Sequence, residues 1–209
     1  MAPPRYTYHY LNVRGIGEPG RQLFVLAGVP FVDKRYEFDE FAKHRHETPF
    51  GQLPVLEFDD GRKVAQSQAI FRYLGKEFGF AGRTPYEQAW VDSLGNQFAD
   101  YFNEILWFFR ASVGKFNGDV EKLKKEAGEP ARDKFFGILE KQLSKTGTGF
   151  LVGDGLTWID LAIADHVDII TDKHPGFFDK FPLIVAHEKR IHEIPALKKW
   201  IAERPKTPF

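Results

Sequence analysis

The hydrophobic pattern of this chain changes near residues 82–85. Before that point, short alternating runs typical of strands are mixed with helical segments. After it, apolar residues recur at steps of three or four, which is typical of helices alone. The change falls at "GRTP", and polar segments with glycine and proline often join domains. We therefore predict an α/β domain over residues 1–81 and an all-helical domain over residues 86–209.

The first domain reads as a small open sheet with helices. The run "RYTYHYL" alternates, with Tyr6, Tyr8 and Tyr10 on one face, and predicts the first strand. Pro19 suits the first turn of the helix that follows, and Gly28 ends it. The other expected elements are a strand over 31–38, a weakly helical piece over 39–47, a hairpin around Asp59-Asp60-Gly61 and a helix over 67–79. The order is thus βαβ, a loop, ββ and α.

The second domain contains only helical patterns. Its first helix carries a broad aromatic face, and Pro130 predicts a kink or break in its second. Thr157 and Asp160 resemble a capping box at the start of the third. The helices are expected over 86–114, 119–143, 156–170, 183–192 and 195–203.

The composition excludes several classes of protein. The chain has 29 basic and 29 acidic residues, so no net charge attracts nucleic acid or an anionic membrane. No apolar run approaches the roughly 18 residues of a membrane span, and the N-terminus has no secretion signal, so we expect a cytoplasmic protein. The absence of cysteine excludes a cysteine nucleophile, so a reacting thiol would have to arrive with the substrate. The 21 Phe, 7 Tyr and 4 Trp suggest an aromatic pocket or an apolar interface.

Three glycines follow the first strand with the spacing Gly15-x-Gly17-x-x-Gly20. This spacing occurs in loops that bind the pyrophosphate of a dinucleotide, with an acidic residue such as Asp33 or Glu37 on the ribose. A dinucleotide domain needs further βαβ units, however, and here the strands end with a hairpin. We therefore interpret the glycines as a strand-to-helix turn that requires small residues.

Six sequence blocks occur in an informative order: "YHYLNVRG", "PFGQLPVLEFD", "AQSQAIFRYL", "EQAWVDSL", "PARDKFFG" and "GFLVGDGLTWIDL". They are spread over essentially the whole chain, which resembles the cytosolic glutathione transferases. Within that superfamily the blocks point to the sigma-like class and its nematode-type relatives, sometimes called nu. The resemblance implies a thioredoxin-like N-terminal domain followed by an all-helical C-terminal domain. It also implies a cytoplasmic homodimer that transfers glutathione to small apolar electrophiles in detoxification.

The resemblance assigns the catalytic role to Tyr10, whose hydroxyl would favour the glutathione thiolate. A tyrosine at such a position can instead be a core residue with a bonded hydroxyl. Pro54 matches the cis-proline of the family. The backbone of Leu53 would pair with the cysteinyl part of the tripeptide, next to Gly51 and Gln52.

The rest of the glutathione site is also implied by the resemblance. Gln66 and Ser67 precede a helix whose N-terminal N–H groups suit the γ-glutamyl carboxylate, although Ser67 can be a simple N-cap. Arg45 occupies the place of a lysine that pairs with the glycine carboxylate. Phe41 replaces a tryptophan and therefore lacks an indole N–H donor. Asp100 would reach the glutathione amino group of the neighbouring subunit in a two-fold dimer.

The second substrate is expected between the Tyr10 loop and the long aromatic helix. Ile16 stands where several sigma relatives carry an arginine, which argues against prostaglandin D synthase activity. Aromatic residues on a helix are also common in cores, so packing is the alternative role for three of the candidates. The candidate residues are Arg14, Ile16, Tyr101, Phe102 and Trp107.

Other functions remain as alternatives. The same fold can carry haem-like or other planar apolar ligands, and the aromatic surplus motivates a carrier hypothesis. A non-catalytic relative of the lens-crystallin type is disfavoured because Tyr10, Gln66 and Ser67 are all present. The spacing of His44 with His46, and of His187 with His192, is poor for metal ligation, so no metal is expected.

Overall fold

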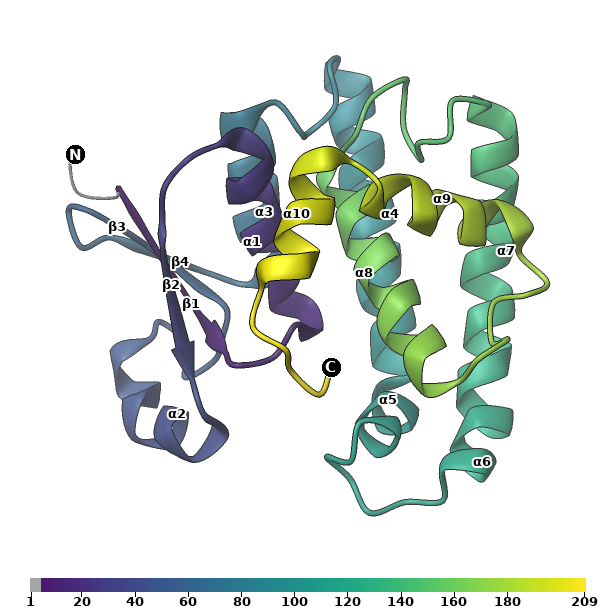
Figure 1. The fold of residues 1–209 in the computed structure, drawn as a ribbon, viewed down its shortest axis with the longest axis horizontal. Coiled ribbons are helices and arrows are strands. Elements are labelled where there is room, and N and C mark those ends of the chain that lie inside the picture. Colours follow the sequence, from purple (N-terminus) through teal and green to yellow (C-terminus); the bar gives the residue numbers. More distant parts are fainter. Residues whose placement is uncertain (1–4) are drawn as a thin grey trace. The chain divides into compact units, whose positions relative to one another are not determined.

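The computed structural model of the chain describes residues 5–209 (Figure 1). These residues form two compact units. The first unit contains the chain up to Ala81 together with His192–Phe209, and the second contains Gly82–Ile191. The last segment of the chain therefore packs with the first unit, although its sequence pattern groups it with the helices that precede it.

The described part of the first unit contains a sheet of four strands in the order β2-β1-β3-β4 (Figure 1). The β1 strand runs parallel to β2 and antiparallel to β3, and β3 runs antiparallel to β4. This mixed sheet, with a hairpin at one edge, is the thioredoxin-like arrangement expected from the sequence. The strands are β1 (Tyr6–Leu11), β2 (Val32–Tyr36), β3 (Val55–Phe58) and β4 (Lys63–Ala65).

Helices lie on both faces of this sheet. On one face Tyr6 and Tyr8 are buried and contact α1, where the Tyr6 and Phe24 rings lie 5.4 Å apart. On the other face Tyr36 packs against Phe41 of α2 at 5.8 Å. The α10 helix lies beside α1 (Figure 1). The helices of this unit are α1 (Glu18–Ala27), α2 (Phe38–His44), α3 (Ser67–Phe78) and α10 (Pro195–Glu203), with short 3-10 turns at η1 (Gly15–Gly17) and η2 (Arg45–Glu47).

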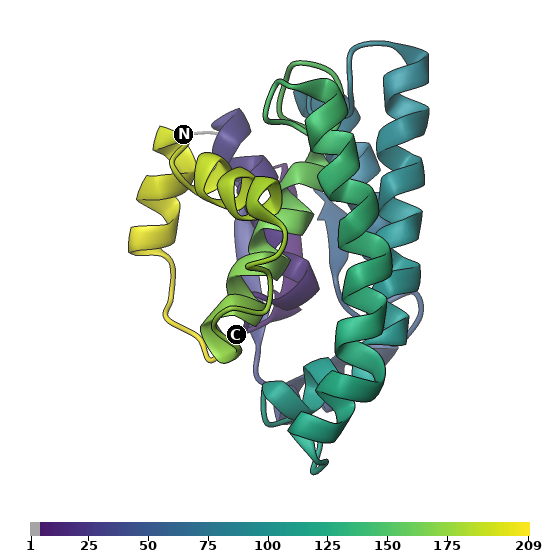
Figure 2. The ribbon, with the colours of Figure 1, turned by 90° about the vertical axis from the view of Figure 1, so that its right-hand side faces the viewer.

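The second unit is helical in its described residues, as predicted. The long helices α4 and α7 run side by side (Figure 2). Pro130 lies in the first turn of α7, directly after a π-helical segment, so the expected break is confirmed. The elements are α4 (Pro85–Glu104), α5 (Leu106–Ser112), α6 (Val120–Leu123), η3 (Lys124–Gly128), α7 (Glu129–Thr146), α8 (Trp158–Lys173) and α9 (Pro182–His192).

The expectation of one helix over residues 86–114 is wrong at Ile105. Its dihedral angles, φ −95° and ψ 4°, separate α4 from α5. Hydrogen bonds continue across this point, because the Ile105 N–H donates to Tyr101 and the Phe109 N–H donates to Ile105. The interruption is therefore a bend, and the complete burial of Ile105 indicates that packing produces it.

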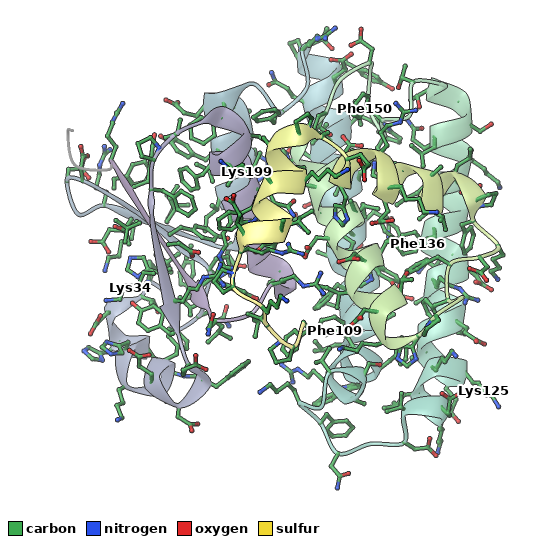
Figure 3. All side chains as sticks on the ribbon, viewed as in Figure 1. Lys34, Phe109, Lys125, Phe136, Phe150 and Lys199 are labelled. Atoms are coloured by element: carbon green, nitrogen blue, oxygen red, sulfur yellow. The ribbon has the colours of Figure 1, made fainter. Side chains whose placement is uncertain are left out.

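The core of the second unit is aromatic. Tyr101 packs against Phe135 at 5.0 Å and against Phe136 at 5.3 Å. Phe136 is fully buried and is labelled in Figure 3. The predicted capping box is confirmed, since the Thr157 side chain accepts from the Asp160 N–H and the Asp160 carboxylate accepts from the Thr157 N–H at 2.8 Å. Much of the aromatic surplus in the composition is thus core. Among the described residues, no helix is both long and apolar enough to cross a membrane.

Gly95 of α4 lies directly against the indole of Trp158, where a Cβ atom would overlap the ring. We expect Gly95→Ala to lower the free energy of unfolding by about 1–3 kcal/mol, because the core cannot accept the added methyl group. Gly137→Ala is the matched control, since nothing lies within 4 Å of a Cβ there and alanine favours the helix. Urea unfolding of both variants measures the difference. Equal effects of the two substitutions would contradict the packing argument.

Candidate functional site

A pocket lies in the first unit where the hairpin meets the start of α3. Two segments contribute most of its walls, one before β3 and one after β4. It includes six of the residues that the sequence assigned to substrate binding, and it also includes Phe50 and Ala65, which the sequence reasoning missed. The lining residues are Ile16, Phe50, Gln52, Leu53, Pro54, Ala65, Gln66 and Ser67.

The start of α3 forms one side of this pocket. Gln66 is the N-cap and Ser67 is the first residue of the helix, so Ser67 is not the N-cap. Gln66 has φ 76°, and it is the one described residue other than glycine with positive φ. Such a conformation costs about 1–3 kcal/mol and often marks a functional constraint. The N–H groups of a helix start, together with the helix dipole, favour a carboxylate at this point.

The opposite wall is formed by the loop that enters β3. The Leu53–Pro54 peptide bond is cis, as expected from the sequence. Gly51 has φ 66°, which glycine adopts without strain. Pro54 is buried, whereas Gln52 is exposed. Gln52, Leu53 and Pro54 thus line the pocket together with the residues at the helix start.

Tyr10 lies in β1, one residue before the strand ends, and its side chain is only 6% exposed. Its ring packs directly on Gly17, where a Cβ atom would overlap ring carbons. Its hydroxyl lies beside Gly15, where a Cβ atom would be 3.0 Å from the hydroxyl oxygen. Ile16, between these two glycines, lines the pocket. The η1 turn thus places the Tyr10 ring next to the residue that borders the pocket.

The sequence reasoning missed a buried cation beside Tyr10. The Arg21 guanidinium is fully buried, and its Cζ lies 5.4 Å from the centroid of the Tyr10 ring. It donates to the backbone oxygens of Leu11 at 3.1 Å and Val13 at 2.8 Å, which follow Tyr10 in the chain. The spacing of Glu18 and Arg21, three residues apart on a helix, is the one sequence signal that points to it.

Two carboxylates keep this cation charged. Arg21 Nε donates to Asp33 at 2.9 Å, and Nη1 donates to Glu18 at 3.1 Å. Burial lowers the pKa of Arg21, but the charges of Asp33 and then Glu18 outweigh it, so the pKa is raised. A buried charge is tolerated only when it is paired in this way.

The expected residues of α2 and the following turn lie on the other face of the sheet. Phe41 is 7% exposed and contacts Tyr36. Arg45 is exposed, and its guanidinium lies 5.6 Å from the Phe41 ring. Neither residue lines the described pocket. Arg45 nevertheless presents its guanidinium at the surface, where it can meet a carboxylate of a ligand.

The remaining candidates belong to the second unit. Tyr101 is 1% exposed, and its hydroxyl lies 3.0 Å from His166 Nε2. Burial lowers the pKa of His166 to about 3, so this imidazole is neutral at pH 7. Phe102 packs on Phe109 at 5.1 Å. Tyr101 is therefore a core residue of this unit.

Asp100 and Trp107 are both exposed in the second unit, Asp100 on α4 and Trp107 on α5. Trp107 is 51% exposed and contacts Phe116 at 4.9 Å. Arg14 belongs to the first unit, where its backbone N–H donates to Phe209 at 2.7 Å.

Comparison with known proteins agrees with the resemblance. The family model for the glutathione S-transferase N-terminal domain matches residues 6–76, and the model for the C-terminal domain matches residues 103–204. The chain belongs to the glutathione S-transferase family. It is therefore a transferase that uses glutathione as a substrate.

Several similar proteins come from nematodes. It is 49% identical over 207 residues to probable glutathione S-transferase 5 of Caenorhabditis elegans, covering 98% of this chain and 99% of the relative. A solved Nu-class glutathione S-transferase from Haemonchus contortus has 46% identity and a TM-score of 0.88, covering 98% of each chain. A Necator americanus glutathione S-transferase described as monomeric has 49% identity and a TM-score of 0.94, covering 98% of this chain and all of that one. The nematode Nu-type therefore fits, whereas the sigma-like class is not confirmed.

The contact between Gly17 and Tyr10 predicts a sensitive position in this transferase. Gly17 has φ −89°, so alanine is acceptable to the backbone, and the overlap with the Tyr10 ring is the main effect. We expect Gly17→Ala to lower turnover of a chromogenic electrophile by about 10 to 100 times, because it displaces the ring. Circular dichroism checks the fold, and Gly137→Ala is the control. Turnover close to that of the wild type would show that the ring position does not matter.

Proposed function

We propose that the Tyr10 hydroxyl donates a hydrogen bond to the sulfur of bound glutathione and stabilises its thiolate. The position of Tyr10 carries this proposal, because its hydroxyl is beside Gly15 and its ring packs on Gly17, the two neighbours of the pocket residue Ile16. The chain has no cysteine, so the reacting sulfur is that of the substrate. A hydrogen bond to the charged form lowers a thiol pKa, and each unit corresponds to about 1.4 kcal/mol.

In this proposal the tripeptide lies along the pocket. The backbone of Leu53 pairs with the cysteinyl unit, next to Gly51 and Gln52. Gln66, Ser67 and the start of α3 bind the γ-glutamyl carboxylate. The positive φ of Gln66 supports this assignment, since strained backbone often marks a functional constraint and Gln66 lines the pocket. The glycine carboxylate is assigned to Arg45, and Phe41 supports this residue by ring contact.

The chemistry is a nucleophilic attack. The thiolate of glutathione forms a bond from sulfur to the electrophilic atom, and the leaving group departs with the electron pair of the broken bond. The protein contributes by holding the thiolate in place and by keeping it ionised. For the electrophile we propose contacts with Ile16 in the first unit, and, separately, we assign Phe102 and Trp107 as apolar contacts in the second.

Tyr10→Phe tests the proposed role of the hydroxyl. We expect kcat to fall by roughly 10 to 1,000 times while the affinity for glutathione stays nearly unchanged, because the ring and the pocket remain. The loss is largest at low pH, where the unassisted thiol is protonated, and it narrows as the pH rises. Initial rates between pH 6 and 9 measure this, with isothermal titration for glutathione binding. Near wild-type turnover at pH 6.5 would eliminate Tyr10 as the donor.

A homodimer in the cytoplasm is also proposed, with Asp100 contacting glutathione bound to the partner subunit. The exposed position of Asp100 on α4 supports this assignment. A relative is described as monomeric, so a dimer does not follow from the family alone. A complete site that depends on Asp100 would require the dimer for full activity.

A carrier of haem-like ligands is the second candidate function, with transferase activity incidental to it. One observation favours it: Trp107 and Phe116 are 51% and 42% exposed, and Arg110 lies 5.3 Å from the Trp107 ring. Exposed rings beside a cation suit a planar ligand with carboxylates.

Titration with haematin separates the two functions. If the second unit carries such a ligand, haematin binds with glutathione present or absent, and Trp107→Ala weakens that binding by about tenfold through loss of ring contact. Turnover of a chromogenic electrophile is measured in parallel, and Phe150→Ala, in another loop of the same unit, is the control. Haematin affinity that is unchanged in Trp107→Ala would reject this surface as the binding site.

A further inference from the structure

The C-terminal segment of the chain reaches the surroundings of Tyr10 through one buried carboxylate. Glu18, at the start of α1, is fully buried. Its Oε1 accepts hydrogen bonds from Trp200 Nε1 at 2.6 Å and from Arg204 Nη1 at 2.8 Å. Both donors come from α10 or the residue after it, which packs on α1 in the first unit (Figure 1). A buried carboxylate at the start of α1 thus connects the first helix to the C-terminal segment.

The other oxygen of Glu18 continues this connection. Oε2 accepts from Arg21 at 3.1 Å, and the Arg21 guanidinium lies over the Tyr10 ring at 5.4 Å. The same guanidinium donates to the backbone of Leu11 and Val13. Two residues, Glu18 and Arg21, therefore connect the donors of the C-terminal segment to the ring of Tyr10.

The end of the chain makes a second connection to the same loop. The backbone oxygen of Phe209 accepts from the Arg14 N–H at 2.7 Å and from the Thr207 hydroxyl at 3.1 Å. Phe209 is 5% exposed, so its side chain is also packed. The loop between Tyr10 and the pocket residue Ile16 is held by Arg21 and by the last residue of the chain.

We propose that Trp200 and Arg204 are positioning residues for the Tyr10 hydroxyl, acting through Glu18 and Arg21. This rests on the proposed role of Tyr10 as the hydrogen-bond donor to the glutathione sulfur. The physical reason is that Arg21 is shared between Glu18 and Asp33. Removal of the Trp200 and Arg204 donors leaves Glu18 with Arg21 as its main partner, so the guanidinium shifts toward Glu18. The ring of Tyr10 follows, and a small displacement weakens a hydrogen bond to sulfur.

The test is the double variant Trp200→Phe with Arg204→Gln in the full chain. We expect the pKa of the bound glutathione thiol to rise, so that kcat at pH 6.5 falls by about fivefold and approaches the wild-type value near pH 9. The KM for glutathione stays within about twofold, because the pocket residues are unchanged. The ultraviolet absorbance of the bound thiolate measures the pKa directly. Arg204→Lys, which keeps the charge, should restore part of the activity when combined with Trp200→Phe.

Lys199→Gln is the matched control. Lys199 is exposed on the same helix, as labelled in Figure 3, and its removal changes the charge of α10 without altering the donors to Glu18. We expect its pH profile to match the wild type. If the double variant does not fold, the same measurements on Trp200→Phe alone test the proposal, because this variant keeps an aromatic ring and removes the N–H donor.

Two results would overturn the proposal. One is an unchanged thiol pKa in a folded variant, and the other is a raised KM with no change in the pH profile, which indicates a structural role only. Failure of the proposed function is separate from both. In that case Tyr10→Phe itself leaves the thiol pKa of the complex unchanged.

Discussion

The place of Tyr10 depends on the cation buried beside its ring. The loop that leaves β1 needs donors for the backbone oxygens of Leu11 and Val13, because buried carbonyl groups without partners are costly. Arg21 supplies both donors from the first turns of α1. One side chain therefore satisfies the loop and packs against the ring of Tyr10. Its own charge is acceptable in the interior only because Glu18 and Asp33 accept from it.

The pocket could be predicted from the sequence because it is built from neighbouring segments. In the hairpin, Val55 of β3 pairs with Ala65 of β4. The residues just before Val55 and just after Ala65 must then lie at the same end of the hairpin. This places Leu53 and Pro54 opposite Gln66 and Ser67 without any information from distant parts of the chain. The resemblance assigned these residues to the site, and the register of the hairpin explains why they lie together.

The features that the sequence did not predict depend on distant contacts. The bend at Ile105 has no glycine or proline to mark it and results from burial. The bonds from Trp200 and Arg204 to Glu18 join residues 182 and 186 positions apart. The sequence pattern groups the last helix with the all-helical domain. A periodic pattern shows which face of a helix is apolar, but it does not show which element covers that face. Such partners are visible only in the three-dimensional structure.

The glycine spacing after the first strand has a steric explanation in this fold. A Cβ at Gly17 would overlap the Tyr10 ring, and a Cβ at Gly20 would lie 2.5 Å from the end of the Tyr8 ring. At Gly15 the neighbour is the Tyr10 hydroxyl. The alternation of β1 points both tyrosines toward α1, and the turn must pass over their rings. The glycine spacing, which resembles that of a phosphate-binding loop, is thus explained by packing. Two tyrosines of β1 point toward the turn and the start of α1, and only glycine leaves room for their rings.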